Sequence, residues 1–123
     1  LAVGTMVLPS IAAAELLERD DLHVTVVNCR FLKPYDEVTL AVVLARHQHV
    51  LIVEEGAVVN GFGAYMSAII AAHDPSIRVR TLGVPDRIIP AAPRPKQLAS
   101  VGLTPDGIAN KVRALLETEV LAG

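Results

Sequence analysis

The sequence predicts a single three-layer α/β/α domain, residues 1–123, with a mainly parallel sheet. Hydrophobic residues make up 52% of the 123 residues and aromatic residues only 3%, so the core must be built from the aliphatic side chains that fill parallel sheets. Short β-branched runs alternate with helix-length stretches, which is the pattern of βαβ crossovers. The length allows one domain with a core of its own.

The stretch from His49 to Ala72 is the predicted centre of that core. His49–Val53 is apolar on both faces, as expected of a strand in the middle of a covered sheet, and the uncharged helical segment after it is the expected crossover. Three further strands complete the predicted sheet, at Leu1–Gly4, His23–Asn28 and Ile77–Leu82.

Prolines predict the start of the first helix and one long irregular segment. Pro9 suits the first turn of a helix whose inward stripe is predicted to be Leu8, Ala12 and Leu16. Residues 83–102 hold four of the eight prolines, and we expect them to wrap across the surface without regular structure.

Capping residues mark two further helices. Asp36 is placed to cap a helix over residues 37–46, and Thr104 to cap the last helix, with a proline in its first turn. The inward stripe predicted for the last helix is Ile108, Val112 and Leu115 or Leu116.

Composition restricts the environment and the partners. The net charge of −2 is made of dispersed acids and bases, which argues against nucleic acid and membrane as partners. A mean hydropathy of +0.47 is high for a small monomer, so we expect a protein partner to cover apolar surface. The single cysteine, Cys29, excludes an internal disulfide and fits a reducing, cytoplasmic setting.

The chain begins inside a predicted strand, at a residue that is not an initiator methionine. We therefore expect it to be a fragment of a longer polypeptide, with or without a further sheet-edge strand before Leu1.

Glu54 and Glu55 follow the central strand at its carboxyl end, the edge of an open α/β sheet that carries binding sites. A functional site is one interpretation. In the other, one carboxylate accepts hydrogen bonds from backbone N–H groups of the glycine turn or of a helix N-terminus, and the other faces solvent. We favour the second, because adjacent side chains of a strand point to opposite faces and cannot both reach one substrate.

The four aromatic residues form two pairs that each follow a predicted strand. Phe31 and Tyr35 come after the second strand, and Phe62 and Tyr65 flank the glycine turn. Both pairs are expected at the same carboxyl edge, either as anchors of a protein contact or as plugs for the ends of the aliphatic core.

Motifs for catalysis and metal binding are missing from the sequence. The four histidines lack the i, i+4 spacing of a helical metal site, and no G-x-S-x-G elbow supplies a nucleophile. The Gly61-Phe62-Gly63 turn lacks the third glycine and the acidic partner of a dinucleotide site, although the helix after it could hold an anion. We predict no catalytic, cofactor-binding or metal residues.

Four motifs in order carry a family resemblance: RFLKPYDE at 30–37, VEEGAVVNGFGAYMS at 53–67, LGVPDRIIP at 82–90 and GLTPDGIANKV at 102–112. Together they resemble the C-terminal domain of the 1-deoxy-D-xylulose-5-phosphate synthases, thiamine-diphosphate enzymes of the transketolase superfamily. This implies a Rossmann-like fold of the transketolase C-terminal type. Two departures are Asn60-Gly61 for the family's Gly-Gly, and Ala91-Ala92 for its His-Gly, which puts in doubt any contact made through that histidine.

The resemblance implies a full-length homodimeric, cytoplasmic enzyme. Such an enzyme decarboxylates pyruvate on thiamine diphosphate with Mg²⁺ and joins the two-carbon unit to glyceraldehyde 3-phosphate, for isoprenoid, thiamine and pyridoxal synthesis. The family's cofactor and substrates lie between two upstream domains, so this part alone is expected to be inactive and free of cofactor.

The expected task of this part is docking on the upstream domains and on the partner subunit. Asp86 beside Arg87 either pairs with a neighbouring subunit or forms a solvated ion pair. Chosen by their place at the sheet edge, the contact candidates are Phe31, Tyr35, Glu54, Glu55, Phe62, Tyr65, Asp86 and Arg87.

Two alternatives stay open. One is the C-terminal domain of another thiamine-diphosphate enzyme, a transketolase or a 2-oxoacid dehydrogenase β-subunit. The other is a free-standing anion-binding or protein-docking module with no enzyme attached.

Overall fold

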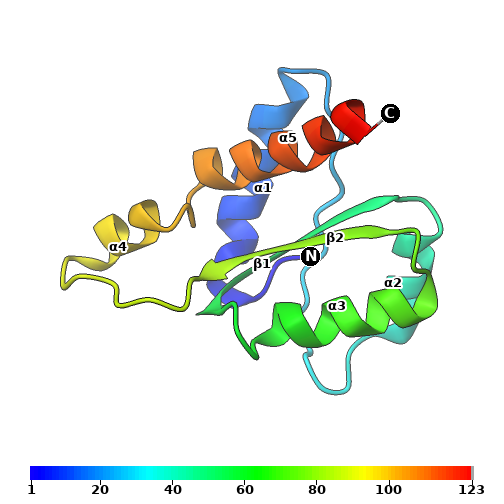
Figure 1. Cartoon of the computed structure of the whole chain (residues 1–123), viewed down its shortest axis with the longest axis horizontal. Helices are drawn as coiled ribbons and strands as arrows, with labels where there is room; N and C mark the ends of the chain where they lie inside the picture. Colours follow the sequence, from blue (N-terminus) through cyan, green and yellow to red (C-terminus); the bar gives the residue numbers. More distant parts are fainter. Residues whose placement is uncertain (123) are drawn as a thin grey trace.

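A computed structural model shows the predicted three layers, with the sheet between two pairs of helices (Figure 1). It describes residues 1–122, and side chains as far as residue 117. Helices α1 and α5 pack against each other on one face of the sheet, and α2 and α3 lie on the other (Figure 1). The elements are a 3-10 turn η1 (Gly4–Met6), α1 (Val7–Glu18), α2 (Glu37–Leu44), β1 (His49–Ala57), α3 (Phe62–His73), β2 (Arg78–Val84), α4 (Arg94–Ser100) and α5 (Pro105–Ala122).

The sheet is parallel, and its best-formed part is the pair β1–β2, in register from His49 opposite Arg78 to Val53 opposite Leu82. Ala2 adds a parallel bridge on each side, to Val53 of β1 and to Asn28. The spatial order is therefore the segment ending at Asn28, then the N-terminal residues, then β1 and β2.

The prediction of four full strands was wrong for the first two. Leu1–Gly4 and His23–Asn28 form only the bridges of Ala2, supported by hydrogen bonds from Ala2 N to Val27 O at 2.9 Å and from Cys29 N to Ala2 O at 2.8 Å. The physical reason is the short overlap: pairing ends at Ala2, so the residues before Val27 have no neighbouring backbone to continue a ladder.

The core is divided between the two faces of the sheet, as the alternation of side chains along β1 requires. Val53 packs with α1, α5 and the 3-10 turn η1, whereas Val50 and Ile52 pack with α2 and α3. The largest fully buried side chains each contribute roughly 1.5–3 kcal/mol of burial free energy; they are Met6, Leu17, Ile52, Ile70 and Leu103.

The predicted inward stripe of the first helix was wrong at Leu8, although Leu16 is partly buried against the core. Leu8 is 77% exposed, and the buried positions of α1 are Ser10, Ala13 and Leu17. The 3-10 turn before α1 explains the change, because it places Met6 in the core and the buried positions follow Met6 at intervals of four, seven and eleven residues.

Residues 83–102 were also wrongly predicted to be irregular throughout, because they include α4. Pro93 is the N-cap of α4 and Pro95 lies in its first turn, where a missing N–H removes no intrahelical bond. The prolines therefore start this helix. In Figure 1, α4 lies at one end of the domain, away from the other helices.

The predicted caps are confirmed. Thr39 donates its backbone N–H to Asp36 at 2.9 Å, and Gly107 donates its N–H to the Thr104 hydroxyl at 3.1 Å. Helix α2 ends two residues before the predicted end, and β1 continues through both glutamates to Ala57. In α5, Ile108 and Leu115 are buried, as predicted.

Within the described residues, every helix is too short or too polar to cross a bilayer.

The α-amino group of Leu1 lies inside the domain and donates to Leu51 O at 2.8 Å. Desolvation by burial lowers the pKa of this group below its usual value of 8.0, and the nearby Cys29 opposes the shift. Keeping the ammonium charged in the folded state therefore costs free energy.

For the 123-residue chain with a free α-amino group at Leu1, this burial predicts a pH dependence of stability. Below the lowered pKa the group is protonated in both states and the full cost applies, whereas above pH 8.0 it is neutral in both and the cost is absent. The free energy of unfolding should therefore rise with pH between the two values, as measured by urea denaturation. An N-acetylated chain is the control, and equal slopes for the two chains would contradict the prediction.

Candidate functional site

The side chain of Glu54 leaves the carboxyl-terminal part of β1 and ends at the N-terminus of α3. Its two carboxylate oxygens accept the backbone N–H groups of Phe62 at 3.1 Å and Gly63 at 2.9 Å, and the residue is only 6% exposed. These N–H groups belong to the first turn of α3, which has no intrahelical acceptors for them. A buried anion thus meets the positive end of a helix dipole, a favourable arrangement.

Four glycines form the wall around this carboxylate. An added Cβ at Gly56, Gly61 or Gly63 would lie 3.0, 2.6 or 3.1 Å from an oxygen of Glu54, and one at Gly83 would lie 3.3 Å from its Cγ. At Gly61 the same Cβ would be 2.1 Å from a backbone carbonyl oxygen, which no side chain tolerates. The glycines are therefore required for the backbone to close around the carboxylate.

Asn60 completes the turn with a φ of 59°, in the left-handed region that asparagine adopts more readily than most residues. The departure from the family's Gly-Gly is therefore accommodated by the backbone of this chain.

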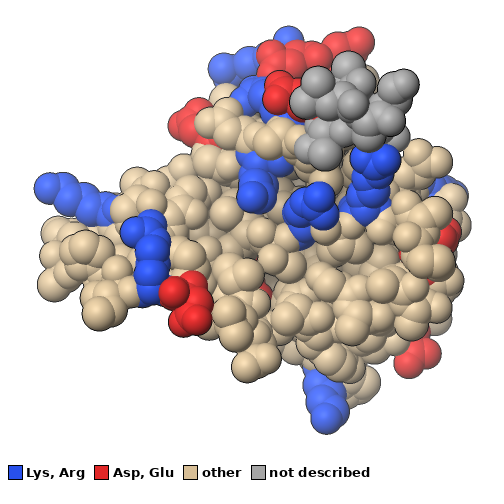
Figure 2. Space-filling view, viewed as in Figure 1, with Lys and Arg blue, Asp and Glu red and all other residues tan. Residues whose placement is uncertain are grey.

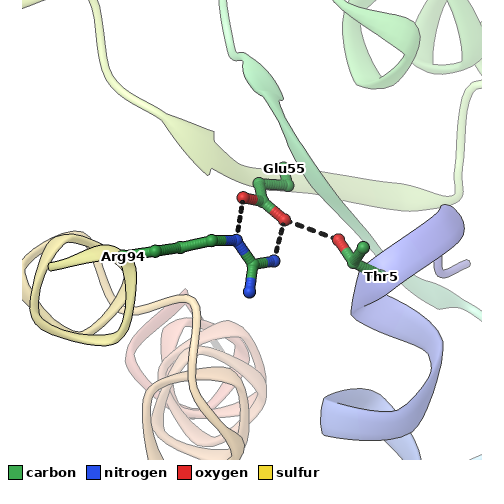
Figure 3. Close-up of polar contacts among 3 residues, drawn as sticks. All are labelled: Thr5, Glu55 and Arg94. Atoms are coloured by element: carbon green, nitrogen blue, oxygen red, sulfur yellow. Dashed lines mark hydrogen bonds and ion pairs between the residues drawn. The ribbon is translucent and has the colours of Figure 1, made fainter.

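Glu55 points to the other side of β1 and connects three parts of the chain (Figure 3). Its carboxylate accepts from the Arg94 guanidinium through two nitrogens, with Nε at 2.9 Å, and from the Thr5 hydroxyl at 2.6 Å. Hydrogen bonds from Arg94 and then Thr5 lower the pKa of Glu55 below its usual value. Because the Glu55 side chain is 30% exposed, water screens this pair, and its main effect is to hold α4 against the domain.

The two carboxylates have separate structural contacts, as the interpretation favoured from the sequence predicts. Glu54 receives backbone N–H groups and Glu55 lies on the outer side, so the two do not converge on a common site.

Three of the four aromatic rings come together beside the glycine turn. The ring centroids of Tyr35 and Tyr65 are 6.5 Å apart with an edge-to-face tilt of 73°, and those of Phe62 and Tyr65 are also 6.5 Å apart. Tyr35 and Phe62 pack against the core, whereas Tyr65 is 46% exposed. Phe31 is 66% exposed and is covered on one side by the Arg30 guanidinium, 5.8 Å from the ring centroid.

The outer face of α3 is a feature that sequence reasoning missed. Six residues of α3 are exposed; one is His73 at its end, and the other five carry no charge: Ala64, Tyr65, Ala68, Ala71 and Ala72. Figure 2 shows the surface over α3 largely free of charged side chains, which gather toward α5 and α4. Only the alternation of buried and exposed positions in the folded helix reveals this face.

Asp86 and Arg87 are both exposed, just beyond β2. They precede Ile88, which is 93% exposed, so the segment after β2 presents two charges and a large apolar side chain together.

The titratable side chains of the described residues are either scattered or engaged in contacts within the domain. Among them there is no group of three or more His, Cys, Asp or Glu side chains placed to hold a metal ion. Glu54 accepts two backbone N–H groups, and Glu55 is paired with Arg94. Burial raises the pKa of the Cys29 thiol, which makes it a poor nucleophile.

Residues 1–108 match the family model described as "Transketolase, C-terminal domain". The chain belongs to this family. A solved structure titled "Split gene transketolase, inactive beta4 tetramer" superimposes with a TM-score of 0.84 at 28% identity, over 94% of this chain and 38% of that chain. The three-layer fold is therefore the fold of transketolase C-terminal domains.

Relatives of this transketolase C-terminal domain carry the name 1-deoxy-D-xylulose-5-phosphate synthase. One from Synechococcus sp. (strain JA-2-3B'a(2-13)) is 38% identical over the whole chain, and one from Gloeobacter violaceus is 43% identical over 97% of it. One from Anaeromyxobacter dehalogenans is 40% identical over 94%. The chain spans about a fifth of the length of these relatives, 19% in each case.

The contacts of the two glutamates predict unequal effects of their removal. Glu54→Ala leaves one buried and one partly buried N–H group without acceptors and should lower the free energy of unfolding by about 3 kcal/mol. Glu55→Ala removes a partly exposed pair and should cost less than about 1 kcal/mol. Urea denaturation of the two variants compares them directly, and a larger loss for Glu55→Ala would refute the assignment.

Proposed function

We propose that this chain is the C-terminal domain of a longer, cytoplasmic 1-deoxy-D-xylulose-5-phosphate synthase. One observation carries the proposal: relatives with that name match this chain along almost all of its length at 38–43% identity, and the match is 19% of their own length. If 123 residues are 19% of the polypeptide, its full length is about 650 residues, and residues 1–123 would be one domain at its end.

The complete enzyme would be a thiamine-diphosphate transferase that condenses pyruvate with glyceraldehyde 3-phosphate and releases CO₂. Thiamine diphosphate and Mg²⁺ would be held by other domains. This is supported by the carboxylates of this chain, since Glu54 and Glu55 are committed to a helix N-terminus and to Arg94. The chain's own contribution would be structural.

That contribution would be docking to the upstream domains and to the second subunit of a homodimer. The outer face of α3 supports it, because five uncharged positions form a surface that water solvates poorly. Tyr65, Phe31, Asp86 and Arg87 are exposed and could contact a partner directly. The other candidates would act indirectly: Tyr35 and Phe62 support Tyr65, Glu54 holds the start of α3, and Glu55 holds α4.

A second candidate is a transketolase whose polypeptide is split between two genes. The solved structure with this fold favours it, because its title describes a split-gene transketolase and an inactive tetramer of one of its chains. In that case the domain would again be joined to another domain, since this chain covers 38% of the solved one.

The size and activity of the natural polypeptide decide between these candidates. We expect a polypeptide of about 650 residues that forms 1-deoxy-D-xylulose 5-phosphate from pyruvate and glyceraldehyde 3-phosphate when thiamine diphosphate and Mg²⁺ are added. A polypeptide of half that size that needs a second chain for activity would support the split enzyme. A free 123-residue protein in the cell would contradict both.

The docking role predicts that a charge on the α3 face weakens assembly. In the longer polypeptide, Ala68→Glu should raise the dimer dissociation constant at least tenfold, about 1.4 kcal/mol, because the carboxylate would lose water on association. Sedimentation velocity measures this. Ala99→Glu on α4 is the matched control, an exposed helical alanine outside the proposed face. Equal effects, or no effect of Ala68→Glu, would contradict docking of α3 on the second subunit.

A further inference from the structure

The turn between β1 and α3 contains an Asn-Gly pair, Asn60–Gly61. In any Asn-Gly pair, a bond from the glycine nitrogen to the carboxamide carbon of the asparagine closes a five-membered ring. Glycine has no Cβ to hinder that approach. The turn therefore contains two neighbouring groups that can react with each other.

The backbone of the turn favours this pair of residues. Asn60 has a φ of 59°, in the left-handed region that asparagine tolerates better than most residues. A Cβ at Gly61 would lie 2.1 Å from the carbonyl oxygen of Ala57, so position 61 accepts only glycine. A larger residue that would crowd the attacking nitrogen is thus excluded by the fold itself.

Both reacting groups are free of other hydrogen bonds. Asn60 is exposed, and its carboxamide makes no hydrogen bond to any residue that the structure describes. The backbone N–H of Gly61 also donates no hydrogen bond within residues 1–122. The carbon that is attacked and the nitrogen that attacks it are both uncommitted, and solvent water reaches the exposed side of the turn.

Contacts on either side of the pair hold it out of the reactive geometry. A residue in the left-handed region turns the following peptide plane away from its own side chain, so ring closure needs this plane to rotate. Gly61 resists the rotation, because its carbonyl oxygen accepts Tyr65 N at 3.2 Å and the next two N–H groups are bound by Glu54. On the β1 side, Val58 N donates to Val84 O at 2.9 Å. The turn is anchored at both ends and must open locally before the ring can close.

We propose that Asn60 is a site of spontaneous deamidation, and that Glu54 sets its rate by holding the start of α3. The nitrogen of Gly61 attacks Cγ of Asn60, its proton leaves with the carboxamide nitrogen as ammonia, and a succinimide ring remains. Water then adds to either ring carbonyl and cleaves the bond from that carbonyl to nitrogen. One product is aspartate, and the other is isoaspartate, in which the main chain runs through Cβ. The reaction needs only water, so it does not depend on the proposed function.

The isoaspartate product would loosen the first turn of α3. It adds one main-chain carbon immediately before Gly61, where the space is already limited by Ala57 O and by the Glu54 carboxylate. The added length displaces the N–H groups of Phe62 and Gly63 from the carboxylate that they bind. The aspartate product leaves the main chain unchanged, and aspartate also tolerates the left-handed region, so this product should have little effect.

The test follows the loss of ammonia at Asn60 in the folded polypeptide that contains this chain. Samples are kept under native conditions at mildly alkaline pH and analysed over weeks by peptide mapping with mass spectrometry. A synthetic peptide of residues 53–67 is the unfolded reference. We expect measurable conversion in the folded protein at a rate at least about tenfold below that of the peptide, because only the opened turn reacts.

Two matched variants test the role of Glu54. Glu54→Gln should raise the rate of conversion at least about tenfold, because a neutral amide holds the two N–H groups less strongly than a carboxylate does. Glu55→Gln makes the same change on the opposite side of β1, where the contacts are to Thr5 and Arg94, and should leave the rate unchanged.

A second readout tests the effect on α3. Amide hydrogen exchange at Gly63 should be at least about tenfold faster in the isolated isoaspartate form than in the variant Asn60→Asp, which carries the same charge on an unaltered main chain. Equal exchange in these two proteins would refute the loosening of α3.

Asn60 left intact in both the wild type and Glu54→Gln would overturn the site. Equal rates in these two proteins, or an equal acceleration by Glu55→Gln, would overturn its control by Glu54. If Glu54→Gln does not fold, the wild type decides alone: conversion as fast as in the peptide contradicts the control by the fold, slower conversion supports it, and no conversion contradicts the site. None of these outcomes concerns polypeptide size or enzymatic activity, so the proposed function is judged separately.

Discussion

The contact between Glu54 and the first turn of α3 is the constraint on which the rest of the structure depends. It joins the end of the central strand to the start of the crossover helix, through two backbone N–H groups that have no other acceptor. The carboxylate is buried, so its charge must be met by fixed dipoles instead of water. The surrounding glycines follow from this requirement, because any side chain at Gly61 would collide with backbone. A structural role thus explains an acid and a glycine-rich turn that together resemble a ligand site.

Fixing the start of α3 also determines which surfaces the domain can offer. With α3 held against β1, Met66 and Ile70 enter the core and the alanine-rich side turns outward next to Tyr65. On the opposite side of β1, Glu55 attaches α4 through Arg94. Adjacent glutamates therefore stabilise two different parts of the molecule, a consequence of the alternation of side chains along a strand. Both glutamates are thus occupied by contacts within the chain.

Local signals predicted the parts of this fold that depend on local physics. The central strand, the Asp36 and Thr104 caps and the role of Glu54 all rest on residues within about ten positions of one another. The Glu55–Arg94 pair joins residues 39 positions apart, and no sequence pattern indicates it.

The wrong predictions have physical causes as well. Leu8 was assigned to the core because the 3-10 turn before α1 has no clear signal in the sequence, and α4 was missed because prolines that begin a helix look like prolines that interrupt one.

The most direct measurement of the central claim is amide hydrogen exchange at Gly63, in the first turn of α3, where helical N–H groups ordinarily exchange freely. If Glu54 holds this turn, the Gly63 amide should be protected as strongly as that of Ile52 in β1. Exchange at the rate of an unstructured chain would contradict the account.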